Sequence, residues 1–342
     1  MKPTPLDEFP VHQTPLPMAQ VGTSDRNFYD RYYFNAHDRT GDVFLVTGFG
    51  VYPNLGVVDA FVTVRHGDTQ RSVRFSDALD ARSLAPAVGG FRIEVIEPLR
   101  TLRLVCEHPD LSVDMTWEGS FDAVLEDRHV LLEGTRAMLD ASRFAQVGSW
   151  SGTLSVDGRD FAVDLDVWLG TRTARGASGR AANRIPPASG RPNRGRASGG
   201  PTFRFAPTTT RWRCPSRRVP TGTARSTTRT RHPDCARLHL TTPRGEPLLL
   251  EVGNLGGVPL SMGSGYASDP AWSHGRWMGR EWSESVSDDM TSPDVVAMLP
   301  FNTVDHVARA TCNGDVGWGL FGHANLGCHD PLGFTDWGDM AK

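Results

Sequence analysis

The chain consists of short apolar runs separated by turn-forming residues. In Arg92–Glu97 and Ser112–Trp117, apolar and polar positions alternate almost strictly, which is the period of a strand with one buried face. Many short strands with such punctuation predict an all-β, antiparallel sandwich or barrel. Similar runs, bounded by Gly, Pro, Asp or Asn, recur at Val43–Val51, Asp59–Arg65, Ser72–Phe75, Leu102–Cys106, His129–Leu132, Ala236–Thr241, Pro247–Val252, Val258–Met262, Arg276–Ser283, Val304–Thr311 and Trp318–Phe321.

A hairpin is predicted within the long strand-like stretch Phe144–Trp168. Asp157 and Gly158 separate its two halves, and Asp-Gly is typical of the two-residue turn that joins antiparallel strands. Helix-like patterns are confined to two short stretches, Ser76–Leu84 and Ser292–Leu299. The chain is therefore expected to contain very little helix.

The strand pattern breaks after Arg172. From Thr171 to Arg231 the sequence has 15 Arg and no Lys, Asp or Glu. Such a composition cannot bury enough apolar surface to offset the entropy of ordering, so we expect residues 173–231 to be poorly ordered. Our favoured interpretation is out-of-frame translation of GC-rich DNA, which yields Arg, Pro, Thr, Ala, Gly and Ser. A disordered linker and a basic arm for nucleic acid or an acidic partner are the alternatives.

This break suggests how the chain is divided. Its length of 342 residues is enough for two domains. We expect a Pro-rich lead-in over residues 1–20, a β domain over 21–172, the Arg-rich segment over 173–231 and a second β domain over 232–335.

Charge and cysteine content exclude several classes of protein. The formal net charge is −3, but the insert holds 15 of the 36 basic residues, so the rest of the chain is acidic and no nucleic-acid partner is expected. The five cysteines form no Cys-x-x-Cys pair, which disfavours a disulfide frame or a structural zinc site. Neither a leader nor a membrane-spanning apolar run is recognisable. We therefore expect a cytoplasmic protein with no cofactor and no metal.

Several fixed spacings carry a family resemblance. Phe144-x-Gln146-x-Gly148-x-x-x-Gly152 precedes Val156-Asp157-Gly158 and Gly170-x-Arg172, and Glu97-Pro98-Leu99-Arg100 and Gly317-Trp318-Gly319-Leu320-Phe321 fit the same pattern. In these motifs the chain resembles the lipocalin-like family of AttH and hydroxyneurosporene synthase (carotenoid 1,2-hydratase), in an uncharacterised actinobacterial branch. The resemblance covers most of residues 20–172 and 232–335.

The resemblance implies two lipocalin-like β-barrel units with an apolar ligand space. In the hydratases of this family, an Asp that follows the Gly-x-Arg motif is thought to protonate a polyene double bond. Thr173 occupies that position here, and Gly322 stands where a Glu is expected. The resemblance thus implies a chemistry for which this chain lacks the usual acids.

Aromatic residues beside the strands are candidates for lining a lipid or terpenoid pocket. The alternative for each Trp is core packing, and for each His a solvated or capping role. Asp305-His306, with His323, is a candidate acid–base or metal-ligand set, although its spacing fits no standard zinc pattern. The candidate ligand-binding residues are Trp117, Gln146, Trp150, Trp168, Arg172, Trp272, His274, Trp277, Trp282, His306 and His323.

These observations lead to a main hypothesis and two alternatives. In the main one, the protein binds a hydrophobic small molecule without transforming it. The first alternative is a lyase-type hydratase, in which a buried carboxylic acid with a raised pKa protonates a double bond of a terpenoid or lipid and water captures the cation. The second, weaker alternative is an interaction protein that uses the basic arm.

Overall fold

The computed structural model describes residues 3–9, 21–80, 85–133, 136–178, 235–241, 246–266, 269, 271–299 and 303–321. Within these ranges the regular structure is almost entirely antiparallel β-sheet, which confirms the predicted fold class. The described helices are α1 (Pro293–Met298) and two single 3₁₀ turns, η1 (Pro5–Glu8) and η2 (Pro53–Leu55). No helix in this part of the chain has the length and apolarity needed to cross a bilayer.

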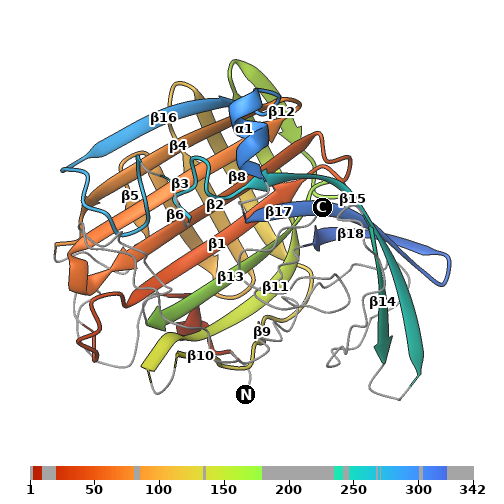
Figure 1. Ribbon diagram of the computed structural model, residues 1–342, viewed down its shortest axis with the longest axis horizontal. Helices are drawn as coiled ribbons and strands as arrows, with labels where there is room; N and C mark the ends of the chain where they lie inside the picture. The colour runs from red at the N-terminus through yellow and green to blue at the C-terminus, as the bar shows by residue number, and fades with distance from the viewer. Residues whose placement is uncertain are drawn as a thin grey trace.

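A 14-stranded sheet forms the body of the molecule (Figure 1). Its main path runs β16-β4-β3-β2-β1-β13-β11-β8-β7-β6-β5, and β9, β10 and β12 also pair with β11. Its strands are β1 (Tyr29–His37), β2 (Val43–Tyr52), β3 (Val57–His66), β4 (Thr69–Ala78), β5 (Ala87–Val88), β6 (Phe91–Glu97), β7 (Thr101–Cys106), β8 (Leu111–Gly119), β9 (Val124–Leu125), β10 (His129–Glu133), β11 (Arg136–Val156), β12 (Arg159–Val163), β13 (Leu169–Ser178) and β16 (Trp282–Asp289).

This sheet rolls around the main hydrophobic core. Strand β5, at one end of the path, lies close to β4, the second strand from the other end. A Cβ built on Gly89, next to β5, would fall 2.7 Å from the Phe75 ring of β4. Side chains of alternate residues fill the interior, as strand periodicity requires. In β3 the inward residues are Val58, Ala60, Val62 and Val64, all of them buried. Full burial of each large apolar side chain contributes roughly 1.5–3 kcal/mol.

The predicted hairpin is confirmed. Asp157 and Gly158 both have positive φ, 51° and 75°, and they join β11 to β12 in antiparallel register. Of the two predicted helical stretches, Ser292–Leu299 contains α1, which Ser292 caps at its N-terminus. The other prediction, Ser76–Leu84, is wrong over 76–80, and residues 81–84 lie outside the described residues: β4 continues to Ala78, because Ser76 pairs with Trp282 of β16 on one side and Asp59 of β3 on the other.

Strand β13 continues six residues beyond Arg172. It pairs with β1 on one side and with β11 on the other, and Ala177 near its end is buried. Thr173 to Ser178, the first residues of the Arg-rich segment, are thus part of the large sheet. The rest of the segment up to residue 234 lies outside the described residues.

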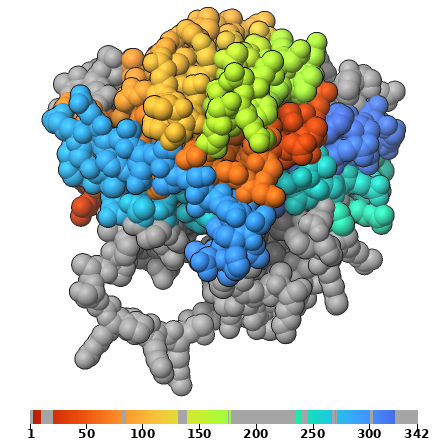
Figure 2. Space-filling view, turned by 90° about the horizontal axis from the view of Figure 1, so that it is seen from above, coloured from red at the N-terminus to blue at the C-terminus, as the bar shows by residue number. Residues whose placement is uncertain are grey.

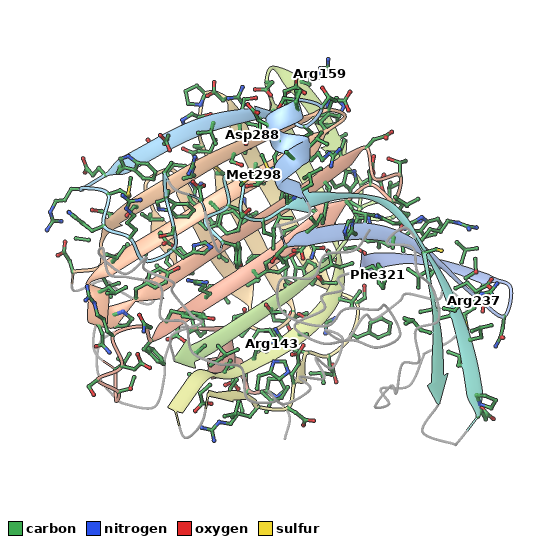
Figure 3. All side chains as sticks on the ribbon, in the orientation of Figure 1. Arg143, Arg159, Arg237, Asp288, Met298 and Phe321 are labelled. Carbon is green, nitrogen blue, oxygen red and sulfur yellow. The ribbon has the colours of Figure 1, made fainter. Side chains whose placement is uncertain are left out.

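The C-terminal half contributes to two sheets. Four of its strands, β14 (Cys235–Thr241), β15 (Pro247–Pro259), β17 (Val304–Cys312) and β18 (Asp315–Phe321), form a separate sheet in the order β14-β15-β17-β18. Figure 1 shows the β14–β15 hairpin extending away from the large sheet, and Figure 3 places Arg237 on it. The fifth, β16, instead adds to the edge of β4. It begins at Trp282, so most of the predicted strand Arg276–Ser283 is a loop with positive φ at Gly279 and Glu281.

Candidate functional site

The two sides of the large sheet differ in how their outer faces are used. The outer positions of β8 are exposed or, at Thr116, half-buried, and they alternate with buried ones as predicted. In β2, by contrast, every residue is buried, because the C-terminal half covers the outer face of β1–β4. Figure 2 shows C-terminal residues, in blue, lying against this side of the molecule. Phe44, Val46 and Phe61 of the large sheet pack here on residues that include Leu260 and Trp272.

Asp59 is the centre of the polar residues in this covered layer. It is fully buried and accepts hydrogen bonds from the Tyr52 hydroxyl (3.0 Å) and the Gly275 backbone N–H (2.7 Å). His274 Nδ1 lies 3.6 Å from Asp59 Oδ1. The Arg31 Nε–H donates to Tyr52 (2.8 Å), so a guanidinium is linked to the carboxylate through a phenol.

Aromatic rings surround His274. Its ring centre lies 4.7 Å from that of Tyr266, 5.1 Å from that of Trp272 and 5.4 Å from that of Phe61. The Tyr266 and Trp272 rings meet it edge-on, the geometry that aromatic pairs favour. The histidine is therefore held between the Asp59 carboxylate and an apolar wall.

A second carboxylate, Asp305 of β17, lies on the same layer. Tyr33 donates a hydrogen bond to Asp305 Oδ2, and Asn35 donates to the Tyr33 oxygen (3.3 Å). Asn35 is fixed in turn by two hydrogen bonds with Thr171, at 2.6 and 3.0 Å. Tyr33 and Tyr266 pack in the same apolar cluster, so the aromatic wall reaches both carboxylates.

The environment of Asp305 favours its protonated form. Burial raises the pKa of this carboxyl to about 6, although the hydrogen bond from Tyr33 opposes the shift. Burial and the neighbouring Asp305 raise the pKa of Tyr33 well above its usual value, so the phenol stays neutral. Asp305 itself is only half-buried in the structure. An acid whose pKa lies close to the working pH can both give a proton to a bound molecule and take one back.

A second polar cluster, formed by Glu8, Gln146 and Arg172, lies inside the rolled sheet at one end; we call it the barrel-end cluster. The Arg172 guanidinium makes a two-pronged contact with the fully buried carboxylate of Glu8, at 2.5 and 2.9 Å. Its Nε–H donates to Gln146 Oε1 (2.8 Å), and Gln146 Nε2 donates to the carbonyls of Leu99 and Phe121, both at 2.7 Å. Every charge in this cluster has a direct partner, so its first role is structural.

Eight of the sequence candidates lie in the packed interior, in the cluster around Arg172 or in the covered layer. Trp117 and Trp150 lie in the packed interior with no exposed surface, Trp150 donates to the Asn35 carbonyl (2.9 Å), and Trp168 belongs to the same core. Gln146 and Arg172 form the barrel-end cluster just described. Trp272, His274 and Trp282 meet in the covered layer.

Three candidates are elsewhere. Trp277 is 51% exposed and lies outside the apolar cluster of the layer. His306 is half-buried on β17, next to Asp305, and His323 lies outside the described residues, as does Gly322. The described residues hold no group of three His, Cys, Asp or Glu side chains arranged to bind a metal.

Sequence reasoning missed Asp59, Tyr33, Tyr52 and Tyr266. A signal for Asp59 was present: it is the one charged residue within the run Val57–Val64, so it interrupts a strand that is otherwise apolar or small. A charge in such a strand is buried wherever both faces are covered, and it then needs partners. Alternation in a single strand does not reveal that the outer face is covered.

Comparison with known proteins gives a family. The profile of a family of unknown function, DUF8625, matches residues 4–191. The chain belongs to DUF8625. The DUF8625 match includes Glu8, Gln146 and Arg172, together with the Tyr33 and Asp59 parts of the covered layer. Asp305 and His274 come from outside the matched residues.

Solved structures of similar shape are distant in sequence. A candidate AttH from Nitrosomonas europaea matches with a TM-score of 0.43 and 13% identity over 87% of this chain and 92% of its own. Kievitone hydratase from Nectria haematococca matches with a TM-score of 0.36 and 13% identity, over 85% of this chain and 87% of its own. CghA with Sch210972 matches with a TM-score of 0.39 and 12% identity, over 94% of this chain and 97% of its own. No curated protein matches this DUF8625 chain.

Proposed function

We propose that the protein is a lyase-type enzyme that hydrates a carbon–carbon double bond of an apolar terpenoid or lipid in the covered layer, with Asp305 as the proton donor. The observation that carries the proposal is the protonation behaviour of Asp305. Its pKa of about 6 and its half-buried position give an acid that is partly protonated just below neutral pH and that a bound molecule can reach. No Arg or Lys among the described residues forms an ion pair that would hold it ionised.

In the proposed reaction a single carboxyl group, that of Asp305, gives a proton and later recovers one. The Asp305 carboxyl protonates one alkene carbon, the adjacent carbon becomes cationic, and water adds to it. The Asp305 carboxylate then takes the proton that the added water loses, which regenerates the acid. The half-buried Tyr266 ring is an aromatic group of this cluster that can stabilise a transient cation.

The position of Thr173 also supports a proton donor beside Tyr33. The resemblance described above expects the proton donor of a hydratase there, and Thr173 lies directly opposite Tyr33 on the paired strand β1. Tyr33 is the residue that hydrogen-bonds Asp305. In this proposal Asp305 supplies, from the other side of Tyr33, the acid that position 173 does not.

Binding without reaction is the second candidate function. It is favoured by the aromatic cluster of the covered layer, which offers apolar side chains of the kind that bind hydrophobic molecules. In that case the covered layer binds an apolar molecule, and Asp305 only hydrogen-bonds Tyr33 at the border of the site.

Heavy-oxygen water separates the two functions. The full chain is incubated with an acyclic polyene hydrocarbon or an unsaturated long-chain alcohol, and the products are analysed by mass spectrometry. We expect one heavy oxygen atom per hydrated product, lost in Asp305→Asn and kept in Asp288→Asn, a control on β16 that is labelled in Figure 3. Thr173→Asp is expected to raise the rate.

Two results would replace the proposal. If native mass spectrometry detects the lipid on the wild-type protein and on Asp305→Asn, but no oxygen is incorporated, the protein is a binding protein. If neither binding nor incorporation occurs, both candidate functions are wrong.

We also propose that the chain is a member of the actinobacterial, hydratase-like branch and that residues 173–231 are read out of frame. The density of Arg without acidic residues supports the second point. Sequencing the gene across this stretch tests it, and an unambiguous trace in the present frame would reject it.

A further inference from the structure

The barrel-end cluster is a carboxylate-binding site with an occupant from a separate segment. The donors belong to the large sheet: Arg172 is on β13, Gln146 on β11, and Leu99 in the turn between β6 and β7. The carboxylate they hold belongs to Glu8 in η1, a 3₁₀ turn that pairs with no strand. The receptor is thus part of the barrel, whereas its occupant is an attached peptide.

The receptor is fixed by contacts that do not involve Glu8. Gln146 is anchored by the Leu99 and Phe121 carbonyls, and its own carbonyl orients the Arg172 Nε–H. The guanidinium carbon lies 5.2 Å from the centre of the Phe144 ring and 5.9 Å from that of Trp117. At Gly119 a Cβ would fall 2.3 Å from Gln146 Nε2, so a larger residue there would displace the amide.

Backbone geometry also serves this site. Leu99 has a φ of +62°, a region that a leucine rarely occupies. In that conformation its N–H donates to Glu8 Oε2, the oxygen that also contacts Arg172 Nη2. A planar fork plus a backbone donor on one oxygen is the arrangement that recognises a carboxylate. A single guanidinium balances a monoanion, whereas the second charge of a phosphate would remain buried and unpaired.

The space around the occupant is larger than Glu8 requires. A cavity of about 70 Å³ adjoins Glu8, and its lining includes Phe9, Tyr32, Arg143 and Phe144. Arg143, labelled in Figure 3, lies near this end of β11 and pairs with Glu126, so its charge is already balanced. The cavity leaves room for a short aliphatic chain beside the carboxylate.

We propose that the Arg172 cradle is a binding site for a small aliphatic monocarboxylate, and that Glu8 occupies it in this structure as a tethered ligand. Release of η1 opens the site, and return of η1 expels the ligand. The Tyr32 hydroxyl, which donates to the Glu8 carbonyl, holds η1 in the occupied position. This site is separate from Asp305 and does not depend on the proposed hydratase activity.

Chemical rescue tests the proposal, because a glutamate side chain beyond its Cα is a propionate unit. Glu8→Gly in the full chain is expected to lower the Tm, and propionate to restore it progressively with concentration by mass action. Propionamide has the same shape without the charge and is expected to have no effect. The wild type is expected to respond little, because its tethered Glu8 has a high effective concentration.

Three outcomes would overturn the proposal: no response of Glu8→Gly to propionate, an equal response to propionamide, or an unchanged response in the double variant Glu8→Gly/Arg172→Met. If Glu8→Gly does not fold, Glu8→Ala provides the test with acetate, since alanine keeps the Cβ and acetate supplies the missing CH₂ and carboxylate. Acetate is then expected to raise the Tm of Glu8→Ala and acetamide is not, and the absence of a shift with acetate contradicts the site.

Discussion

The two buried polar clusters of this protein differ in the partners of their carboxyl groups. At the barrel end, the Glu8 carboxylate meets a guanidinium directly, and the hydrogen-bond partners of both are supplied. In the covered layer, Asp305 meets a phenol, and Asp59 meets a phenol, a backbone N–H and a histidine. The first cluster is therefore built on a direct ion pair, whereas in the second the carboxyl groups meet neutral donors and a histidine.

This difference indicates why the second cluster is the candidate for chemistry. A buried ion pair that is fully hydrogen-bonded holds its groups in one arrangement, and a substrate would have to displace those partners to reach them. A carboxyl group whose neighbours are neutral shifts its pKa towards the pH at which an enzyme works. The predictions below test whether the clusters differ as this argument requires.

The largest effect is expected from Arg172→Met. This change leaves the Glu8 carboxylate buried without its counter-charge, which costs roughly 3–5 kcal/mol in the free energy of unfolding. Urea unfolding measures it. Arg103→Met is the matched control, because Arg103 pairs with Asp114 and Glu94 on the exposed face of β6–β8, and little change is expected there. Equal losses in the two variants would mean that burial of the pair does not matter.

A smaller loss is expected from Asp59→Asn. The amide can still accept one hydrogen bond, but its NH₂ group faces one of the two donors, the Tyr52 hydroxyl or the Gly275 N–H. A buried donor left without an acceptor costs about 1–3 kcal/mol. Hydrogen exchange at Gly275 should accelerate, whereas exchange at the Leu99 N–H of the barrel end should not. Faster exchange at both sites would show that the clusters are not independent.

The strand pattern was readable from the sequence, whereas the second layer was not. Alternation in β8 identified a strand with one exposed face, and the Asp157-Gly158 turn was identified by its residue types. These features depend on neighbours in the chain. The end of β4 was misread as helix, because its pairing with β16 joins residues about 200 positions apart.

The same limit applies to the candidate sites. Trp272 and His274 were found because they are close in sequence and chemically conspicuous. Their partner Asp59 was not, since only the folded chain brings the Gly275 N–H to its carboxylate. Likewise, Arg172 was singled out by a motif, but nothing in the sequence pairs it with Glu8, 164 residues earlier.

The pH dependence of stability should distinguish Asp305 from the barrel-end pair. The ordinary pKa of an aspartate is about 3.8, and that of folded Asp305 is about 6, so the folded state binds more protons between these values. Its contribution to stability is therefore present below about pH 4 and is lost as the pH rises to about 6. Asp305→Asn removes this dependence, so the variant should gain stability relative to the wild type over that interval. A constant difference between them in urea titrations would contradict the raised pKa.

The smallest effect is expected from Trp277→Ser, which tests where the aromatic layer ends. Trp277 is 51% exposed, whereas Trp272 is fully buried against His274 and Trp282. Substitutions at exposed positions usually change the free energy of unfolding by no more than about 0.5 kcal/mol. Trp277→Ser should therefore keep both its stability and any co-purifying lipid, as judged by native mass spectrometry. Loss of the lipid in this variant would mean that the ligand contacts the outer surface of the loop, and the binding site would have to extend beyond the covered layer.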